Sequence, residues 1–485
     1  NQLSFTTFCF ISELHYLCPK INTNQYNMKK SISFALMMAA VLGAQAQNGG
    51  ITPDMLAAMR ADFKHTPADK AIFNAMAGTS IAVLARSQES KANFDGNFSD
   101  MVVSHGITNQ KSSGRCWLFT GLNVLRAQMM AKHGLNHMEF SQVYCFFYDQ
   151  LEKSNLFLQG VIDTRRKPMD DKMVEWLFRN PLNDGGQFTG ISDIIGKYGV
   201  VPSSVMPETY SSENTAQISS LITLKLREFG LQLREEGQQK KVTDQQLVAR
   251  KAEMMKTIYR MLALAYGEPV QKFTYTIKGE TKEYTPQSFF QEYLGNDLTG
   301  NYVMLMNDPT REYYKCYDID FDRHAYDGRN WTYVNLPVED IKEMAIKSIK
   351  DSTMMYFSCD VAKFLDRKAG TLDIRNFDYA SLMGTTFGMD KKQRVQTFAS
   401  GSSHAMTLMA VDLDKDGKPK KWMVENSWGA DAGYKGHLIM TDEWFNEYMF
   451  RLVVEKKYVP AKVLDILKQQ PIHLPAWDPM FASEE

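Results

Sequence analysis

The sequence is poor in cysteine, with six cysteines among 485 residues and no Cys-x-x-Cys pair. A chain this long with so few cysteines is not a small domain held together by disulfides. Cys145 falls in an apolar helical pattern and Cys359 ends a strand-like run, so both are expected in the core. Cys116 is set apart from them, because polar and basic residues precede it.

An excess of charge of one sign is also missing. The 55 lysines and arginines are balanced by 56 aspartates and glutamates, which gives a formal net charge of −1. This balance gives no reason to expect binding to nucleic acid or to an anionic membrane surface. A neutral partner, or one of mixed charge, is favoured instead.

Long hydrophobic runs are absent too, since the apolar run at residues 32–42 is too short to cross a bilayer. Residues 28–30 read Met-Lys-Lys and residues 44–46 read Ala-Gln-Ala, which is the order of a signal peptide. The pattern predicts a leader at residues 28–46, export to the periplasm or medium, and a non-native extension at residues 1–27. A buried N-terminal helix is the alternative.

A polar loop at residues 109–115 runs directly into an apolar helical pattern that begins at Cys116. A thiol in the first turn of a helix lies at the positive end of the helix dipole, and Arg115 adds a full positive charge beside it. Both effects favour the thiolate, which is the nucleophilic form of cysteine. An inert cysteine packed in the core is the alternative interpretation.

Residues 109–117, Asn-Gln-Lys-Ser-Ser-Gly-Arg-Cys-Trp, resemble the active-site loop of papain-like cysteine peptidases. In that family a glutamine six positions before the nucleophile helps to form the oxyanion hole, and an aromatic residue follows the cysteine. Gln110 and Trp117 occupy these positions. Ser113 stands where papain and the cathepsins have another cysteine. This departure points to the bleomycin hydrolase and aminopeptidase C branch, which the phrase closely resembles.

The apolar pattern after Cys116 predicts one long helix that ends at Gly134. His133 and His137 are four residues apart, a spacing that can hold a metal ion on a helix. Gly134 separates them, however, and no acidic third ligand follows in phase. No metal site is therefore expected.

Residues 183–187, Asn-Asp-Gly-Gly-Gln, form a loop in which Gly185 and Gly186 leave the backbone bare for close approach. A plain turn explains the glycine pair equally well from the sequence alone. The resemblance implies that this loop lines the cleft and binds the backbone of the substrate.

Two long amphipathic patterns lie between Ile218 and Tyr266 and predict a pair of helices. We interpret residues 211–300 as an inserted helical subdomain. Residues 205–300 contain 12 basic and 12 acidic side chains, so their net charge is zero. Binding of nucleic acid by this insertion is therefore not expected.

Residues 402–429 read as a strand, a turn and a second strand. If the strands meet at a turn near residues 414–419, His404 faces the neighbourhood of Gly429, and Asn426 lies a few residues away. A β-bulge could close the remaining offset. An amide oxygen that accepts from the imidazole N–H would fix the orientation of the ring, and Trp428 could shield that bond.

The order Cys116, His404, Asn426 and the phrase Asn-Ser-Trp-Gly at residues 426–429 also resemble papain-like peptidases. The resemblance implies a nucleophile, a proton carrier and an orienting amide, with no metal or other cofactor. The implied catalytic residues are Cys116, His404, Asn426 and Gln110, and the implied substrate-binding residues are Gly185, Gly186, Trp428 and Glu485.

The expected fold class is α+β, a papain-like peptidase with a helical lobe, a β-barrel-like lobe and an inserted helical subdomain. The predicted segments are an N-terminal arm and helical lobe with Cys116 at 47–210, the insertion at 211–300, a β-rich lobe with His404 and Asn426 at 301–460, and a C-terminal arm at 461–485.

The resemblance further implies peptide substrates and a homo-hexamer, with no nucleic acid and no membrane span after the leader is removed. It also implies that the last residues, 481–485, enter the cleft, where a terminal carboxylate binds the free amine of a peptide. The expected activity is thus that of an aminopeptidase on short peptides. An endopeptidase, an acyl transferase and a catalytically silent binding protein on the same fold stay open as alternatives.

Overall fold

The computed structural model describes residues 49–89, 94–295 and 297–480. The predicted leader at 28–46, the extension at 1–27 and the tail at 481–485 lie outside the described residues. The chain divides into two units, 1–79 and 80–485.

The first unit contains two helices, α3 (Pro53–Asp62) and α4 (Pro67–Gly78). Each begins with a proline that follows a threonine N-cap, and Thr66 and Asp69 form a reciprocal capping box at α4. Neither helix contains a buried residue. Local capping, and not a core of their own, therefore defines these helices.

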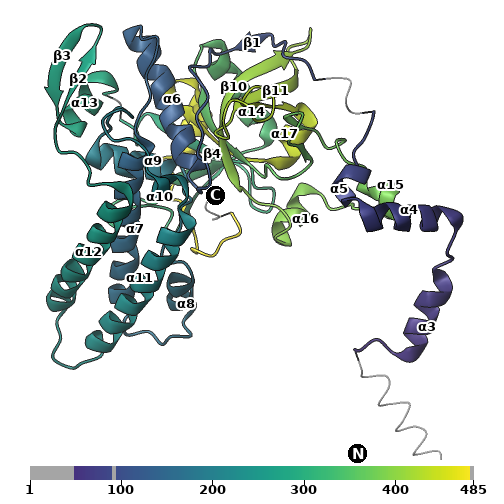
Figure 1. Cartoon of the computed structure of the whole chain (residues 1–485), viewed down its shortest axis with the longest axis horizontal. Coiled ribbons are helices and arrows are strands. Elements are labelled where there is room, and N and C mark those ends of the chain that lie inside the picture. The colour runs from purple at the N-terminus through teal and green to yellow at the C-terminus, as the bar shows by residue number, and fades with distance from the viewer. Residues whose placement is uncertain (1–48, 90–93, 296, 481–485) are drawn as a thin grey trace, which may run out of the picture. The chain divides into compact units, whose positions relative to one another are not determined.

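The second unit combines a helical half with a sheet (Figure 1). In chain order its elements are α5 (Ile81–Leu84), β1 (Asp100–Met101), α6 (Cys116–His133), α7 (Gln142–Asp163), α8 (Lys172–Arg179), α9 (Phe188–Tyr198), α10 (Tyr210–Glu213), α11 (Ala216–Gly237), α12 (Asp244–Tyr266), β2 (Phe273–Ile277), β3 (Glu280–Tyr284), α13 (Pro286–Tyr293), β4 (Tyr302–Met306), β5 (Lys315–Ile319), β6 (Thr332–Asn335), α14 (Val338–Lys350), β7 (Met355–Cys359), β8 (Leu365–Asp366), β9 (Thr371–Leu372), α15 (Tyr379–Met383), α16 (Lys391–Gln396), β10 (His404–Leu413), β11 (Pro419–Glu425), β12 (His437–Thr441), α17 (Asp442–Tyr448), β13 (Met449–Glu455), a 3-10 helix (Lys456–Tyr458), α18 (Ala461–Ile466) and β14 (Ile472–Leu474).

Helix α6 is the central helix of this unit and begins at Cys116, as predicted. It ends at Gly134, whose left-handed backbone (φ 56°) closes the last turn at no steric cost, which confirms the predicted end of the helix. The helix packs against α9 on one side and strand β10 on the other, so most of its residues are buried (Figure 1). This position explains why α6 has an apolar pattern on nearly all its faces.

Helices α11 and α12 confirm the predicted pair, and both lie along α7 (Figure 1). Their inward-facing residues, such as Leu226 and Ile258, belong to the same hydrophobic cluster as Phe147 of α7 and Leu122 of α6. The insertion therefore shares the core of the helical half. The boundaries given above for the separate segments stay a prediction.

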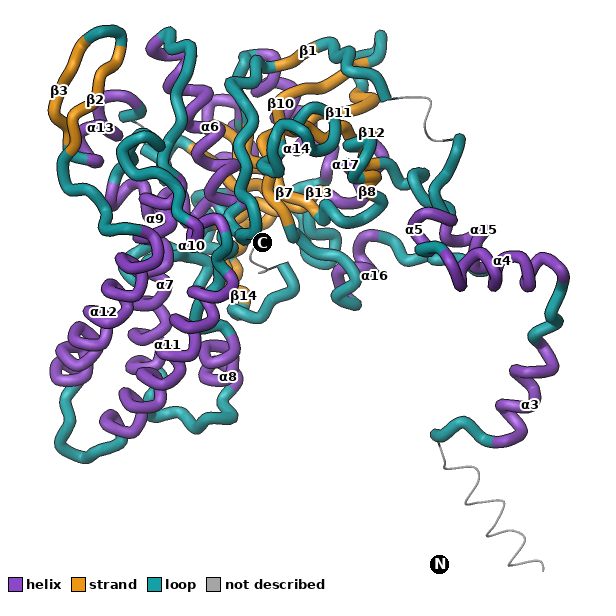
Figure 2. The backbone as a smooth tube through the Cα atoms, in the orientation of Figure 1, coloured by secondary structure: helices purple, strands orange, loops and turns teal. Residues whose placement is uncertain are grey.

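Strands β2 and β3 pair as a separate antiparallel hairpin, and the other described strands form one large mixed sheet, in which β7, β10 and β11 are neighbours (Figure 2). Strand β10 is buried over most of its length and pairs antiparallel with β7 and with β11. Helices α14 and α17 cover the sheet through a second apolar cluster that includes Trp422, Trp444 and Phe445. The strand order among the described residues is β14-β5-β6-β4-β13-β7-β10-β11-β12-β9-β8, with β1 beside β10.

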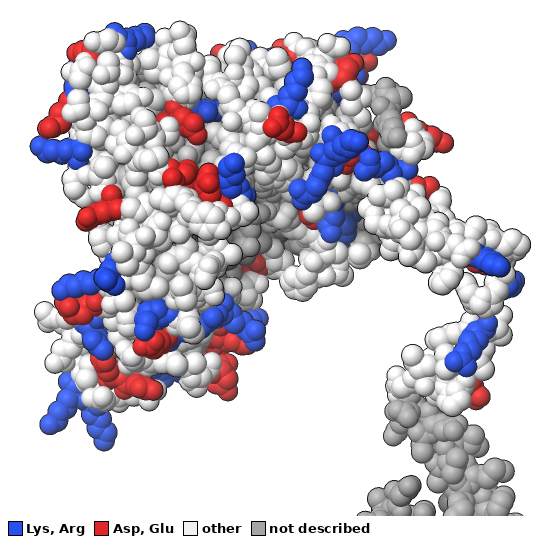
Figure 3. All heavy atoms as spheres, viewed as in Figure 1, with Lys and Arg blue, Asp and Glu red and all other residues white. Residues whose placement is uncertain are grey.

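Basic and acidic side chains are interspersed over the visible surface of the molecule (Figure 3). This mixture agrees with the formal net charge of −1. Among the helices that the structure describes, none is both long and apolar enough to span a membrane.

Candidate active site

Cys116 is the first residue of α6, and its side chain is fully buried. The N-cap residue, Arg115, makes no side-chain capping hydrogen bond, so the amide groups of the first turn are not capped by that side chain. A thiol at this position lies at the positive end of the helix dipole, which was the first of the two effects expected from the sequence.

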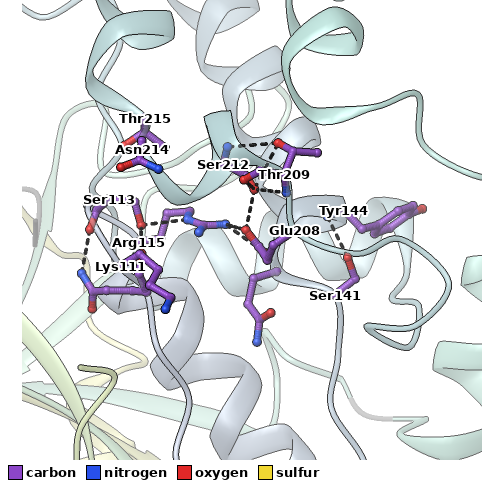
Figure 4. Close-up of polar contacts among 12 residues, drawn as sticks. Lys111, Ser113, Arg115, Ser141, Tyr144, Glu208, Thr209, Ser212, Asn214 and Thr215 are labelled. Atoms are coloured by element: carbon purple, nitrogen blue, oxygen red, sulfur yellow. Dashed lines mark hydrogen bonds and ion pairs between the residues drawn. The ribbon is translucent and has the colours of Figure 1, made fainter. Parts of the chain in front are cut away.

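The second expected effect, an uncompensated positive charge on Arg115 beside the thiol, is wrong. The guanidinium of Arg115 is fully buried, and its Nη1 lies 2.8 Å from Oε2 of Glu208 (Figure 4). Its Nε donates to Ser113 Oγ over 2.9 Å, while Ser212 Oγ donates to Glu208 Oε2 over 2.6 Å. Glu208 therefore compensates the charge, and Arg115 fastens the nucleophile loop to residues 208–212.

Gln110 fastens the same loop to the segment that follows strand β11. Its backbone N–H donates to the carbonyl of Ser427 over 2.8 Å, and its Oε1 accepts from Ser427 Oγ over 2.6 Å. Its Nε2 donates to the carbonyl of Ser113 over 2.7 Å. Because Asn109 also forms a β-bridge with Trp428, the loop that carries the nucleophile lies against residues 427–429.

The hairpin β10–β11 has the register that the sequence predicts. From Ala410 to Asp412 the paired residue numbers sum to 833, as in Ala410↔Met423 and Val411↔Trp422. A register shift between Leu408 and Ala410 changes the sum to 832 and moves the partner of each residue by one. The predicted bulge is thus present on the His404 side of the strand.

His404 and Asn426 meet at the open end of this hairpin. The ring Nε2 of His404 donates to Asn426 Oδ1 over 2.9 Å, so Nδ1 is the nitrogen that can exchange a proton with a thiol. Burial lowers the pKa of His404 to about 4, against the opposing effect of the hydrogen bond that the ring donates to Asn426. Trp428 covers the pair, since the centres of its ring and the imidazole are 5.0 Å apart.

The glycine loop at 183–187 is bound to the residue that follows the nucleophile. Trp117 Nε1 donates to the carbonyl of Asp184 over 2.9 Å. A Cβ atom at Gly186 would lie 2.7 Å from the ring of Trp117, so only glycine allows this approach. Lys153 also donates to the carbonyls of Asn183 and Gly185.

Several contacts that hold the site were not predicted. Glu208 and Lys153 each contact a partner 30 or more residues away in the sequence and stand in no recognisable local pattern. Asp184 belongs to the glycine loop identified from the sequence, but the bond from Trp117 to its backbone carbonyl was not predicted. Glu485, the last of the predicted substrate-binding residues, lies outside the described residues. Within the described ranges no group of three His, Cys, Asp or Glu side chains could hold a metal ion.

Comparison with known proteins gives consistent matches over most of the chain. The sequence profile of the Peptidase C1-like family matches residues 50–481. The chain is 38% identical to aminopeptidase C of Lactobacillus delbrueckii subsp. lactis over 430 residues, which are 86% of this chain and 95% of that protein. It is 40% identical to human bleomycin hydrolase over 393 residues, which are 78% of this chain and 86% of that protein.

Among solved structures, PepW of Lactobacillus rhamnosis superposes with a TM-score of 0.85 at 37% identity and covers 90% of this chain and 99% of its own. One prediction is overturned by the comparisons. Aminopeptidase C and bleomycin hydrolase are cytosolic enzymes, which contradicts the export predicted from residues 28–46.

Proposed function

Because the chain belongs to the Peptidase C1-like family and is a papain-like cysteine peptidase of the aminopeptidase C and bleomycin hydrolase type, we propose that it trims short peptides from their free N-terminus. In this proposal Cys116, His404 and Asn426 form an acyl-enzyme machinery. The observation that carries it is the hydrogen bond of 2.9 Å between His404 Nε2 and Asn426 Oδ1.

The first half of the reaction begins when Nδ1 of His404 takes the proton of the Cys116 thiol and the sulfur attacks the carbonyl carbon of a peptide bond. The C–N bond then breaks, and His404 gives its proton to the leaving amine, so that a thioester remains on Cys116. In the second half, His404 takes a proton from a water molecule, whose oxygen attacks the thioester carbon. The C–S bond then breaks, the acid is released, and the proton on His404 returns to the sulfur of Cys116. Asn426 holds the imidazole in one orientation during both transfers.

Gln110 fits the role of an oxyanion-hole donor. Its Oε1 accepts from Ser427, which leaves the amide nitrogen as the end that faces the nucleophile loop. Nε2 carries two hydrogens and the bond to the carbonyl of Ser113 uses one of them, so the second is available to a developing oxyanion. The arrangement supports stabilisation of the tetrahedral intermediate without a metal ion.

A restriction to free N-termini is proposed for residues 481–485, with Glu485 contributing the carboxylate that binds the substrate amine. The segment that leads to them is firmly anchored. Asp478 pairs with Arg311, and the buried Arg451 donates to the carbonyl of Met480. The carbonyl of Pro479 lies 3.8 Å from the position of a Cβ at Gly401, three residues before His404, so a short tail can reach the site.

We also propose that the enzyme is a homo-oligomer, a hexamer by family resemblance. The helices of the first unit expose several large apolar side chains and bury none of their own. An apolar set of this kind on a monomer usually marks a surface that another protein covers. The exposed residues are Ile51, Met55, Leu56, Met59, Phe63 and Phe73.

The decisive experiment compares peptides that differ only in N-acetylation. Stepwise loss of N-terminal residues from the free peptide, with the acetylated peptide resistant, is expected. Removal of residues 481–485 should then shift cleavage toward internal bonds. Equal cleavage of both peptides by the full-length enzyme would contradict the aminopeptidase assignment, and aminolysis products formed with added amines would favour the acyl transferase.

A further inference from the structure

Arg367 projects from a tight loop between the short strands β8 and β9. Asp366 Oδ1 accepts from the backbone amides of Lys368 and Ala369, over 3.1 and 3.2 Å, and the amide of Gly370 donates to the carbonyl of Asp366 over 2.8 Å. The Asp366 carboxylate also pairs with Arg86 at 3.4 Å. These contacts fix the backbone from which Arg367 extends.

The loop is also held from outside. Gly370 has a positive φ of 71° and lies so close to residues 433–434 that a side chain there would collide with their backbone. Its carbonyl accepts from the amide of Ile439 over 2.9 Å, which ties the loop to strand β12. Arg367 therefore stands on a rigid support, although its side chain is exposed.

The guanidinium of Arg367 lies over the indole of Trp428, with 4.8 Å between Cζ and the ring centroid. The indole in turn contacts the imidazole of His404, at 5.0 Å between ring centres. Arg367, Trp428 and His404 thus form a continuous stack that ends at the proposed proton carrier. Burial is the main reason why the pKa of His404 is lowered, and the positive charge of Arg367 lowers it further.

Arg367 differs from the other arginine near the site in having no acidic partner. Arg115 is buried and paired with Glu208, whereas Arg367 forms no ion pair with any carboxylate among the described residues. A guanidinium that is fixed, exposed and uncompensated is suited to bind a carboxylate from a ligand, because its planar donors match both oxygens.

The chemistry indicates which part of a substrate meets this group. His404 protonates the leaving nitrogen, so the residue that carries this nitrogen must lie beside the imidazole and the indole that covers it. On the proposed function above, on which this inference rests, we propose that Arg367 forms a cationic subsite for the residue after the scissile bond. The preferred substrates are then peptides whose second residue is Asp or Glu.

The test uses free peptides with the same first residue and with Glu, Gln or Lys as the second residue. For the full-length enzyme we expect kcat/KM for the Glu peptide to exceed that for the Gln peptide by about threefold to tenfold, the range of one exposed charge pair in a partly desolvated site. The Lys peptide should be the poorest substrate. Arg367→Gln should remove the ranking, Arg367→Lys should keep most of it, and Arg367→Glu should reverse it.

A role for Arg367 in merely supporting Trp428 predicts a different result. Loss of the stack would lower the rates of all three peptides by a common factor and leave their ratio unchanged, and that outcome would overturn the subsite. Lys415→Gln, which removes one positive charge at the turn between β10 and β11, is the matched control and should leave the ranking intact. Failure of the wild-type enzyme to cleave any of the three peptides would count against the proposed function, whereas cleavage of all three peptides at equal rates would count against the subsite alone.

Discussion

The two segments that supply the candidate site are held in place in different ways. His404 and Asn426 stand at the end of the hairpin β10–β11, whose backbone ladder continues into β7 and β12. Cys116 follows a loop at 109–115 that makes main-chain bonds to Ser427 and Glu213 and is otherwise held by side-chain contacts to remote residues. A ladder depends on main-chain groups that every sequence possesses, whereas much of the anchoring of the loop depends on particular side chains.

The comparison predicts that substitutions in the hairpin and substitutions in the nucleophile loop have different effects on activity and stability. On the hairpin side, loss of a side chain should impair chemistry and leave the backbone in register, because its neighbours keep the ladder. On the loop side, loss of a buried partner should displace the nucleophile together with the fold around it, because an unpaired charge remains in the interior. Substitutions that separate activity from stability can therefore test the difference.

The largest effect is expected for the residues that take part in the reaction. Cys116→Ala removes the nucleophile and should lower kcat by on the order of 10⁴-fold to 10⁶-fold, with His404→Ala nearly as severe. Asn426→Ala should cost less, because the amide orients the proton carrier and does not transfer the proton itself. Steady-state kinetics with a fluorogenic peptide and an active-site titration would measure the three losses.

All three variants are expected to keep the folded state, and their thermal unfolding should resemble that of the wild type within a few degrees. Substantial hydrolysis by purified Cys116→Ala would refute the mechanism. A loss of folding in Asn426→Ala would contradict the idea that the ladder alone holds the hairpin.

A large loss of stability is expected on the loop side. Arg115→Met leaves Glu208 without its partner and should lower the free energy of unfolding by about 1 to 3 kcal/mol, less than in a fully buried ion pair because the Glu208 side chain is 25% exposed. The variant should also lose activity, since the loop before Cys116 loses an anchor. Urea unfolding followed by fluorescence measures the change.

The matched control is the double variant Arg115→Met with Glu208→Gln, in which no lone charge remains. It should recover part of the lost stability. If the single and double variants are equally stable, the unpaired charge of Glu208 costs nothing, and the lost stability comes from the packing and hydrogen bonds of Arg115 instead.

The same difference explains how much the sequence could predict. The helix from Cys116 to Gly134, the hairpin register and its bulge follow from local patterns, and all three were confirmed. The partners of Arg115 and Trp117 did not follow, because Glu208 and Asp184 lie 93 and 67 positions away and only the folded chain brings them near. The prediction that Arg115 places an unopposed charge beside the thiol failed because the sequence does not reveal its pairing with Glu208.

On the hairpin side, the protonation of His404 should make the stability of the protein depend on pH. Burial lowers the pKa of His404 from 6.5 to about 4, so the unfolded chain binds this proton more tightly than the folded chain. The neutral His404 therefore contributes to the free energy of unfolding by at most about 3 kcal/mol. This contribution is complete above pH 6.5 and is lost as the pH falls through 4. Denaturant titrations from pH 7 to 4 measure it.

Because other groups titrate in the same range, the informative quantity is the difference between wild type and His404→Gln. The variant should show a shallower loss of stability between pH 6.5 and 4. Parallel curves for the two proteins would mean that His404 is not desolvated in the folded state.

The smallest effect is expected at the glycine loop, where the contact is steric. Gly186→Ala introduces a Cβ that meets the rings of Trp117 and His324, and overpacking of this kind usually costs about 1 to 3 kcal/mol. Trp117 adjoins Cys116, so the displacement should also lower kcat/KM.

Gly196→Ala is the matched control, because Gly196 lies in helix α9 with open space around it. This substitution should stabilise the helix by up to about 1 kcal/mol. Opposite signs for the two variants would show that the close approach of the loop to Trp117, and not a general intolerance of alanine, restricts residue 186. Equal and neutral effects would mean that the loop is free to move away from the nucleophile helix, and the proposed distinction between a rigid hairpin and a side-chain-anchored loop would then lose its steric support.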